Sequence, residues 1–260
     1  MHWIQPKVFL IAHSFPAKKF EEWLSFIGAK DYEVELRKTS LSAAENIITV
    51  AARRCYMSFA PNLNPNIKKI RKDGEEYLTN ILASGHGSVL EHASFSYAIE
   101  NVSRVFTGEM NRHRAGVSIS EGSMRFIRYN DLPLVETPFF RSERGKFLRE
   151  KVEELACLIE TRYVELSSNV HDRDSFAIKK EMTSLIRRIL PMGIATGGIW
   201  TLNVRALRHI LALRTAEGAE EEIREVVNLV YQETLASLPN LLGDFTQTTS
   251  GNLVPKHAKV

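Results

Sequence analysis

The densest group of residues able to do chemistry lies between Arg112 and Arg125. Arg112, His113 and Arg114 are consecutive, small residues follow, and the segment ends in Glu121, Gly122, Ser123 and Arg125. Arginine guanidinium groups bind phosphate oxygens through paired hydrogen bonds, serine adds a neutral donor, and small residues let backbone N–H groups approach a ligand. The pattern favours a phosphate clamp, although it contains no Walker-type GxxxxGK[ST] sequence. A solvated basic turn is the plain alternative, because runs of charge usually face solvent.

Two further groups carry titratable side chains. His86, Ser88, Glu91 and His92 share residue types with a metal site, but the HExxH pattern is missing and no fourth ligand is nearby, so we expect no metal. The second group is Asn203, Arg205, His209 and Arg214. If these residues lie on one helix with 100° per residue, Arg214 lies about 20° around the helix axis from Asn203, whereas Arg205 and His209 lie at about 200° and 240°. The two pairs therefore face opposite ways. Polar stripes on an otherwise apolar helix need partners: a ligand, another subunit or internal glutamates.

The two cysteines, Cys55 and Cys157, are too few for a disulfide scaffold and show no CxxC spacing. We therefore expect a reducing compartment, the cytoplasm. Cys157 lies in an amphipathic helical pattern and is expected in the core. Cys55 follows two arginines that could lower the pKa of its thiol, which makes it a minor candidate nucleophile.

Composition describes a globular protein. The 260 residues carry a net charge of +3, with 44% hydrophobic and 25% charged residues, which argues against disorder, collagen and coiled coil. No apolar run reaches the roughly 18 residues needed to cross a bilayer, and we interpret the apolar start as a buried strand over 8–12 rather than a signal peptide. Without internal repeats or a Pro/Gly/Ser-rich linker, we expect a single domain over 1–245 and a polar tail over 246–260.

Hydrophobic periodicity predicts the elements that position these groups. Alternation predicts a strand over 94–99 and another extended piece over 124–129. A helical step of three to four residues predicts helices over 16–27, from Ser40 to about 51, over 65–82, 143–170, from an Asp174 cap to Pro191, 198–213 and 219–238.

The candidate groups occur in the order found in the flavin-dependent thymidylate synthases, which the sequence resembles from about Ala51 to Leu238. The resemblance rests on the segments 86–97, 103–104, 112–114, 121–125, 203–205, 213–214 and 219–224. It implies an α+β fold with an antiparallel β-sheet and long helices. It also implies FAD as cofactor, dUMP as substrate, methylenetetrahydrofolate and NADPH as co-substrates, and a homotetramer that shares its active sites between chains. The implied reaction converts dUMP to dTMP and releases tetrahydrofolate.

The resemblance also implies roles for individual residues. Arg214 corresponds to the catalytic arginine that holds the pyrimidine edge and favours ionisation at N3. The implied cofactor-binding residues are His86, Ser88, Arg112, His113, Arg114, Glu121, Asn203, Arg205 and His209. The implied substrate-binding residues are Glu109, Arg112, Glu121, Gly122, Ser123, Arg125, Arg187 and Arg214.

Two departures from the family pattern keep alternatives open. Eight residues separate Arg114 from Ser123 where the family motif has seven, so the loop must bulge or shift by one residue. Glu109 stands where the family has Gln, and a carboxylate near a phosphate repels it unless it is paired. A C5 methylase of another pyrimidine nucleotide, such as UMP, is therefore the alternative.

A different class of protein, a non-catalytic nucleotide or nucleic-acid binder, would use the basic residues Arg104, Arg112, Arg114, Arg125 and Arg128. The pI near 8.8 permits this function. Aromatic residues that could stack on bases are not interleaved with these arginines, however. We therefore expect neither a nucleic-acid nor a membrane partner.

Overall fold

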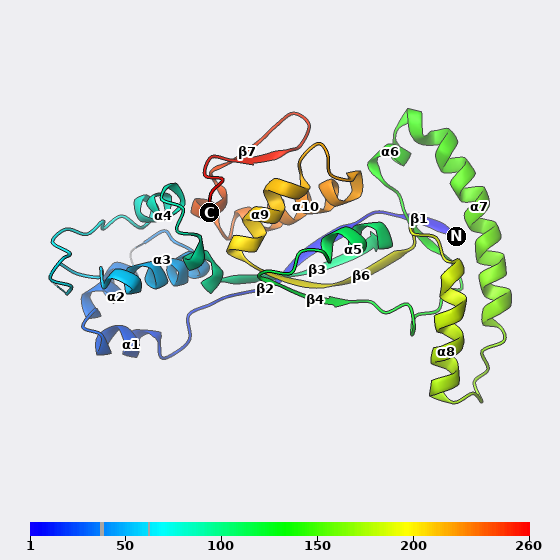
Figure 1. Cartoon of the computed structure of the whole chain (residues 1–260), viewed down its shortest axis with the longest axis horizontal. Helices are drawn as coiled ribbons and strands as arrows, with labels where there is room; N and C mark the ends of the chain where they lie inside the picture. Colours follow the sequence, from blue (N-terminus) through cyan, green and yellow to red (C-terminus); the bar gives the residue numbers. More distant parts are fainter. Residues whose placement is uncertain (37–38, 62) are drawn as a thin grey trace.

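An antiparallel sheet forms the middle of the molecule. The computed structural model describes residues 1–36, 39–61 and 63–260. Figure 1 shows an elongated chain with this sheet at its centre, one group of helices at one end and a long helical arm at the other. The strand order is β2–β3–β6–β4, with every neighbour antiparallel, and the strands span Lys7–His13, Ser94–Ser103, Ala195–Asn203 and Val117–Glu121. The predicted α+β fold with an antiparallel sheet is confirmed.

Three helices pack on one side of the sheet (Figure 1): α5 (Arg104–Met110), α9 (Val204–Arg214) and α10 (Glu221–Leu235). Two of them follow a strand directly, and a polar side chain starts each one. The Ser103 hydroxyl accepts from the N–H groups of Val105 and Phe106, and the Asn203 side chain accepts from Ala206 N. These N-caps satisfy N–H groups that a helix start otherwise leaves unpaired.

The first end of the molecule is built from α1 (Phe20–Phe26), α2 (Lys30–Leu36), α3 (Ala43–Tyr56) and α4 (Gly74–Ala83). Helix α3 begins with a capping box in which Ser42 and Glu45 bond to each other's backbone N–H. A 3-10 segment, η1 (Gly87–His92), then leads into β3.

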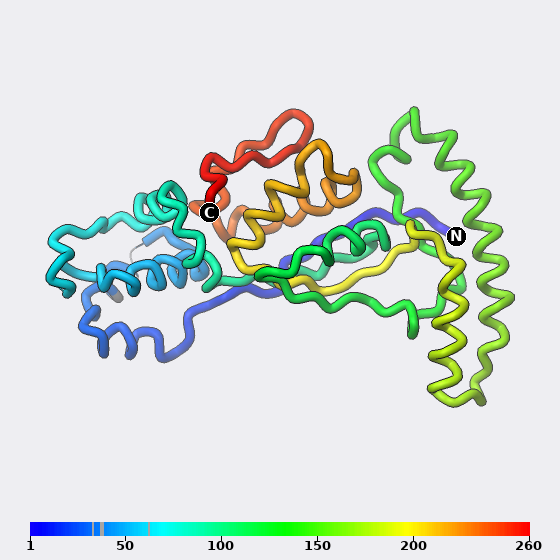
Figure 2. The backbone as a smooth tube through the Cα atoms, in the orientation of Figure 1, coloured from blue at the N-terminus to red at the C-terminus, as the bar shows by residue number. Residues whose placement is uncertain are grey.

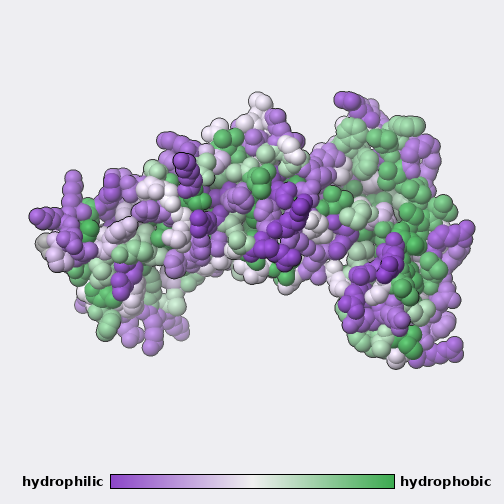
Figure 3. All heavy atoms as spheres, viewed as in Figure 1, coloured by the Kyte–Doolittle hydropathy of each residue, from purple (hydrophilic) through white to green (hydrophobic). Residues whose placement is uncertain are grey.

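The arm at the other end consists of α6 (Pro138–Arg141), η2 (Glu143–Gly145), α7 (Lys146–Ser167), α8 (Phe176–Ile186) and η3 (Arg187–Ile189), beside β1 (His2–Ile4) paired with β5 (Pro133–Val135). It has its own small core around Leu134, Tyr163 and Ile194. Figure 3 shows apolar patches on the surface of this arm, interrupted by hydrophilic side chains. The exposed apolar residues of α7 and α8 include Phe147, Leu155, Leu158, Phe176 and Leu185.

The C-terminal part folds back onto the core. After α11 (Pro239–Leu242), the strands β7 (Phe245–Gln247) and β8 (Leu253–Pro255) form a hairpin, and Leu253 is buried. The tube in Figure 2 shows the chain ending near the α3–α4 end of the molecule. The predicted polar segment 246–260 therefore contributes a buried residue and a β-strand.

Several element predictions are wrong. Residues 198–213 do not form one helix, because the apolar run to Leu202 is strand β6, the helix starts at Val204, and Asn203 is its N-cap rather than a residue on one of its faces. Segment 124–129 forms no strand: residues 124–126 are a turn, in which Phe126 N donates to Ser123 O, and residues 127–129 have no regular secondary structure. Ser175, not Asp174, caps α8.

Burial differs from expectation at two places. Strand β2 is buried only at Val8, and Phe9 and Ile11 are each 50% exposed. Phe9 pairs with Ala98, and Ala98 pairs with the 44% exposed Ile199, so this row of side chains lies on the face of the sheet opposite the buried Val8 and Ile99. Cys157 is exposed rather than in the core, as is Cys55. No helix in the described ranges is long and apolar enough to cross a membrane.

Candidate active site

Arg214 stands at the C-terminal end of α9, where two side chains from the α5 region fix its guanidinium group. Its Nε atom donates to Nε2 of His113 at 2.8 Å, and its Nη1 atom donates to Oε2 of Glu109 at 2.7 Å. Its Nη2 atom also donates to the Glu109 carbonyl oxygen at 3.3 Å. The Arg214 side chain is only 16% exposed, so this ion pair is partly shielded from water.

His113 is held in its neutral form. Its pKa is lowered to about 4, chiefly because burial disfavours the charged ring, and also because Arg214 and His209 lie close by. The His209 ring lies edge-on to it, with 6.0 Å between the ring centroids. A neutral imidazole can accept the hydrogen bond from Arg214, and a protonated one cannot.

A second polar cluster joins α5, β4 and β6. Glu121 forms an ion pair with Arg104 and accepts a hydrogen bond from Nδ2 of Asn111 at 2.8 Å. The Asn111 carbonyl group accepts in turn from Nε1 of the buried Trp200 at 3.1 Å. Glu121, which was predicted to contact cofactor and substrate, is therefore locked in orientation by the core of the sheet.

Arg104 also borders a pocket of about 510 Å³ that lies between α5 and η3. Arg187 and Arg188 line it together with Asn111 and Met124, and no carboxylate is among its lining residues. The pKa of Arg104 is lowered, first by burial and then by repulsion from Arg187. Arg104 is paired with Glu121, but Arg187 and Arg188 form no ion pair among the described residues, so the pocket has an excess of positive charge. This excess favours an anionic ligand such as a phosphate.

A third group surrounds a hollow of about 360 Å³ at the start of η1. His86, Ser88, Arg205 and Cys55 line it. Arg205 is oriented by Glu91, whose Oε1 atom accepts from Nη1 at 2.6 Å. Glu91 is thus engaged in an ion pair, and the described residues contain no group of three or more His, Cys, Asp or Glu side chains placed to hold a metal ion.

The remaining predicted residues do not converge on one point within a single chain. Arg112 and Arg114 are exposed, and Ser123 is exposed in the turn after β4. Arg125 points toward the helical arm, where its Nε atom donates to Oγ of Ser184 at 3.3 Å. Gly122 N donates to Gly197 O at 2.8 Å, next to the pairing of β4 with β6.

The loop before β4 does not bulge inside the strand. Residues Val117 to Glu121 pair with β6 without interruption. Gly116 has a φ of 70°, a conformation that favours glycine, and its carbonyl oxygen accepts from Asn203 N at 2.9 Å. Strand β4 is therefore regular from Val117 to Glu121, and a turn at Gly116 leads into it.

Sequence reasoning gave no site role to Asn111, Trp200 or Arg188. Asn111 had one usable signal, its position beside Arg112, but its bond to Trp200 joins residues 89 apart in the chain. Arg188 follows Arg187 directly, and the pattern did not show that both border the same pocket.

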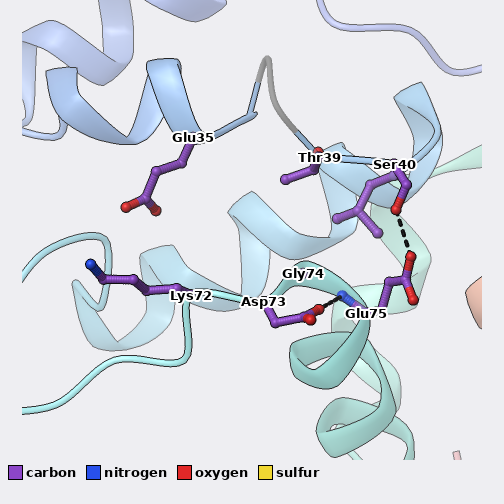
Figure 4. A pocket seen from close by; sticks show the side chains of 8 residues that line it. Glu35, Thr39, Ser40, Lys72, Asp73, Gly74 and Glu75 are labelled. Atoms are coloured by element: carbon purple, nitrogen blue, oxygen red, sulfur yellow. Dashed lines mark hydrogen bonds between the residues drawn. The ribbon is translucent and has the colours of Figure 1, made fainter.

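A different pocket, of about 400 Å³, lies between α2 and the start of α4 (Figure 4). Three of its lining residues bond to one another: Asp73 Oδ1 accepts from Glu75 N at 2.8 Å to cap α4, and Ser40 Oγ donates to Glu75 Oε1 at 2.5 Å. It contains none of the predicted site residues.

Comparison with known proteins identifies the family. Residues 36–240 match the family described as "Thymidylate synthase complementing protein". The flavin-dependent thymidylate synthase of Mycobacterium tuberculosis (strain H37Rv) is 32% identical over 216 residues, which cover 81% of this chain and 83% of that protein. The chain belongs to the flavin-dependent thymidylate synthase family. The flavin-dependent thymidylate synthase of Mycobacteroides abscessus is 31% identical over 216 residues, which again cover 81% of this chain and 83% of that protein.

Solved structures agree on the fold of this flavin-dependent thymidylate synthase family member. Two structures of thymidylate synthase X from Helicobacter pylori, each in complex with FAD and dUMP, are 22% identical to it with TM-scores of 0.55 and 0.56. The matches cover 76% and 78% of this chain and 91% and 95% of those chains. The predicted family is confirmed, and membership in an enzyme family decides against the non-catalytic binder.

Proposed function

We propose that this enzyme converts dUMP to dTMP by reductive methylation, with FAD as cofactor, methylenetetrahydrofolate as carbon donor and NADPH as reductant, and releases tetrahydrofolate. The family supports methylation of dUMP, and the two structures from H. pylori hold FAD and dUMP. The observation that carries the proposal is the clamped guanidinium of Arg214, held by His113 and Glu109 in a partly buried position.

Arg214 would supply the electrostatic part of the reaction. Uracil C5 is a poor carbon nucleophile unless negative charge can build up on the ring, at N3 and its neighbouring oxygen. A guanidinium group has five N–H donors, and the recorded bonds of Arg214 use one on each of its three nitrogens. Its other N–H groups are available to the pyrimidine edge, and a cation fixed in advance stabilises the developing charge without reorganising. No cysteine adduct is needed.

The residues around the η1 hollow fit part of the cofactor. Its walls combine the donors of His86, Ser88 and Arg205 with apolar atoms of Ala52 and Val89. At about 360 Å³ it is at the small end of ligand pockets, which span roughly 300–1,000 Å³, so it suits one portion of FAD. When bound, FAD supplies the hydride chemistry that amino-acid side chains lack. His86, Ser88 and Arg205 would hold the cofactor, and the Arg112–Arg114 segment would border it.

A homotetramer with shared sites explains why the substrate residues are dispersed in one chain. Ser123 and Arg125 are exposed near the arm, whereas Arg214 is at the end of α9. We propose that Ser123 and Arg125 of one chain, with Arg187, bind the phosphate of a nucleotide whose base rests on another chain's Arg214. The exposed apolar side chains of α7 and α8 support association of the chains. The two free cysteines support a reducing compartment, the cytoplasm.

The pairing of Glu109 is compatible with dUMP, which has no ribose 2′-hydroxyl group. The carboxylate pairs with Arg214 at 2.7 Å, so it has a partner without a ribose hydroxyl. This pairing also removes the repulsion that an unpaired carboxylate would exert on a phosphate.

The test is chemical. Purified protein should be yellow and release FAD on denaturation, and it should form dTMP from dUMP, methylenetetrahydrofolate and NADPH. Arg214→Ala should weaken dUMP binding by about 2–5 kcal/mol in calorimetric titration, while Arg173→Ala, a change at an exposed residue of the arm, should leave it unchanged. A colourless protein that takes up no FAD would overturn the proposal.

A further inference from the structure

A cavity of about 270 Å³ beside the proposed flavin hollow has no part in the function described so far. It lies between α3, α4 and the segment that connects them. Tyr56 and His86 line both this cavity and the η1 hollow, and their rings stack with 6.3 Å between centroids. A ligand that rests against the flavin could therefore extend past these two rings into the cavity.

A buried cation forms one wall of the cavity. Arg53 is 1% exposed, and its guanidinium group lies 4.9 Å from the ring centroid of Tyr32 and 4.3 Å from that of Tyr77. It donates to the Tyr32 hydroxyl group at 3.1 Å and to the carbonyl oxygens of Ser58 and Arg71 at 2.8 and 2.6 Å. All these acceptors are neutral, so they orient the charge without cancelling it.

The two backbone bonds of Arg53 also shape the cavity. Ser58 and Arg71 stand near the two ends of the segment between α3 and α4, and one guanidinium group holds both. The segment thereby presents Lys69 and Arg71 to the cavity. The Arg71 side chain forms one exposed ion pair, with Glu76 at 3.2 Å, and no ion pair of Lys69 is recorded among the described residues.

The lining is amphipathic. Ile67, Ile70 and Ile81 supply apolar surface, the tyrosines supply aromatic faces, and no carboxylate is among the lining residues. Apolar walls with a cationic rim suit a ligand whose flat apolar part ends in carboxylates. The volume is below the roughly 300 Å³ of typical whole-ligand pockets, so it suits the end of a larger molecule.

We propose that this cavity binds the benzoyl-glutamate end of the folate co-substrate, with Lys69 and Arg71 facing the glutamate carboxylates and Arg53 providing a fixed positive field behind them. The inference rests on the proposed function, since that reaction places a folate next to the flavin. The pterin end would then lie on the flavin side of Tyr56 and His86, and the glutamate end would lie in the cavity.

The experiment uses a pair of ligands that differ only in the glutamate. FAD-loaded wild-type protein is titrated calorimetrically with folic acid and with pteroic acid, which lacks glutamate. We expect wild type to bind folic acid more tightly by about tenfold, and the double variant Lys69→Gln/Arg71→Gln to lose this preference while its affinity for pteroic acid is unchanged. Lys68→Gln is the matched control, because Lys68 is an exposed neighbour that does not line the cavity.

Three results would overturn the proposal: no binding of folic acid to the FAD-loaded wild type, equal affinity of wild type for the two ligands, or an undiminished preference for folic acid in the double variant. A further arm titrates adenosine 2′,5′-bisphosphate. Binding that depends on Lys69 and Arg71, without a folate preference, would assign the cavity to a nucleotide phosphate instead. FAD content and dTMP formation, measured on the same preparations, separate failure of this inference from failure of the proposed function.

Discussion

The Nε atom of Arg214 lies 2.8 Å from Nε2 of His113, although the two residues are 101 positions apart in the chain. Because the guanidinium N–H donates, Nε2 must carry a lone pair, which assigns the ring proton to Nδ1. Burial, Arg214 and His209 together lower the pKa of His113 to about 4, so this arrangement holds at neutral pH. The histidine thus positions the arginine without adding a second positive charge.

The first prediction concerns pH. An unfolded chain binds a proton at His113 near pH 6.5, whereas the folded chain does so only near pH 4. The contribution of His113 to stability is therefore complete above pH 6.5 and is lost as pH falls toward 4. His113→Gln, whose side-chain carbonyl group can still accept from Arg214, should lack this loss. Urea unfolding at pH 7.5 and pH 5 should show a larger decrease for wild type than for the variant, and equal decreases would contradict the assignment.

The second prediction concerns Glu109. Glu109→Gln keeps an acceptor for Arg214, and the pair is partly exposed, so dUMP affinity should change by less than about 1.5 kcal/mol. If Glu109 instead accepted from a ribose hydroxyl group, the change would weaken UMP selectively. Methyl transfer to dUMP and to UMP is measured for both proteins. A selective loss with UMP would show that the carboxylate recognises a ribonucleotide.

The sequence predicted most helices but not the strand that organises the site. The run from Ala195 to Leu202 is apolar enough for a buried helix or a buried strand, and periodicity does not separate the two. Strand pairing decides the matter here: Gly197 faces Glu100, and Gly198 faces the backbone of Ser120, at distances that leave no room for a Cβ atom. These are long-range contacts, which local pattern cannot reveal.

The same limit applies to the site. Family resemblance put Glu109, His113 and Arg214 in one site, and the structure places them in direct contact. The resemblance did not reveal that Asn111 joins Glu121 to Trp200, since this network depends on the register of β4 against β6. Tertiary structure likewise decides that Ser123 and Arg125 lie apart from Arg214 within one chain, which local sequence could not show.

The third prediction concerns the C-terminal part. Arg208 is 4% exposed and forms two hydrogen bonds, of 2.6 and 2.9 Å, with the carboxylate of Asp244. Removing one member of a buried pair leaves an uncompensated charge, so Asp244→Ala should lower the free energy of unfolding by about 3–5 kcal/mol. Asp172→Ala, at an exposed position in the loop before α8, is the control and should change it by less than about 0.5 kcal/mol. Urea denaturation measures both, and similar midpoints for the two variants would contradict the prediction.

The last prediction concerns Glu222, which is 1% exposed beneath the start of α5. Its Oε1 atom accepts from Ser103 N at 2.6 Å, and its Oε2 atom accepts from the Ser103 hydroxyl group that caps the helix carrying Arg104 and Glu109. Burial raises the pKa of Glu222 to about 7, and the two hydrogen bonds from Ser103 offset only part of that effect.

The sign of the pH dependence follows from this shift. The unfolded chain loses the Glu222 proton near pH 4.5, whereas the folded chain keeps it until about pH 7. The contribution of Glu222 to stability is therefore complete below pH 4.5 and is lost as pH rises through 7. The Gln side chain of Glu222→Gln cannot titrate. The free energy of unfolding of this variant should therefore rise relative to that of wild type as pH increases from 5 to 8. Glu222→Ala should cost about 1–3 kcal/mol at pH 5, because Ser103 N–H then has no partner. Parallel stability curves for wild type and Glu222→Gln would show that this carboxyl group is ionised throughout.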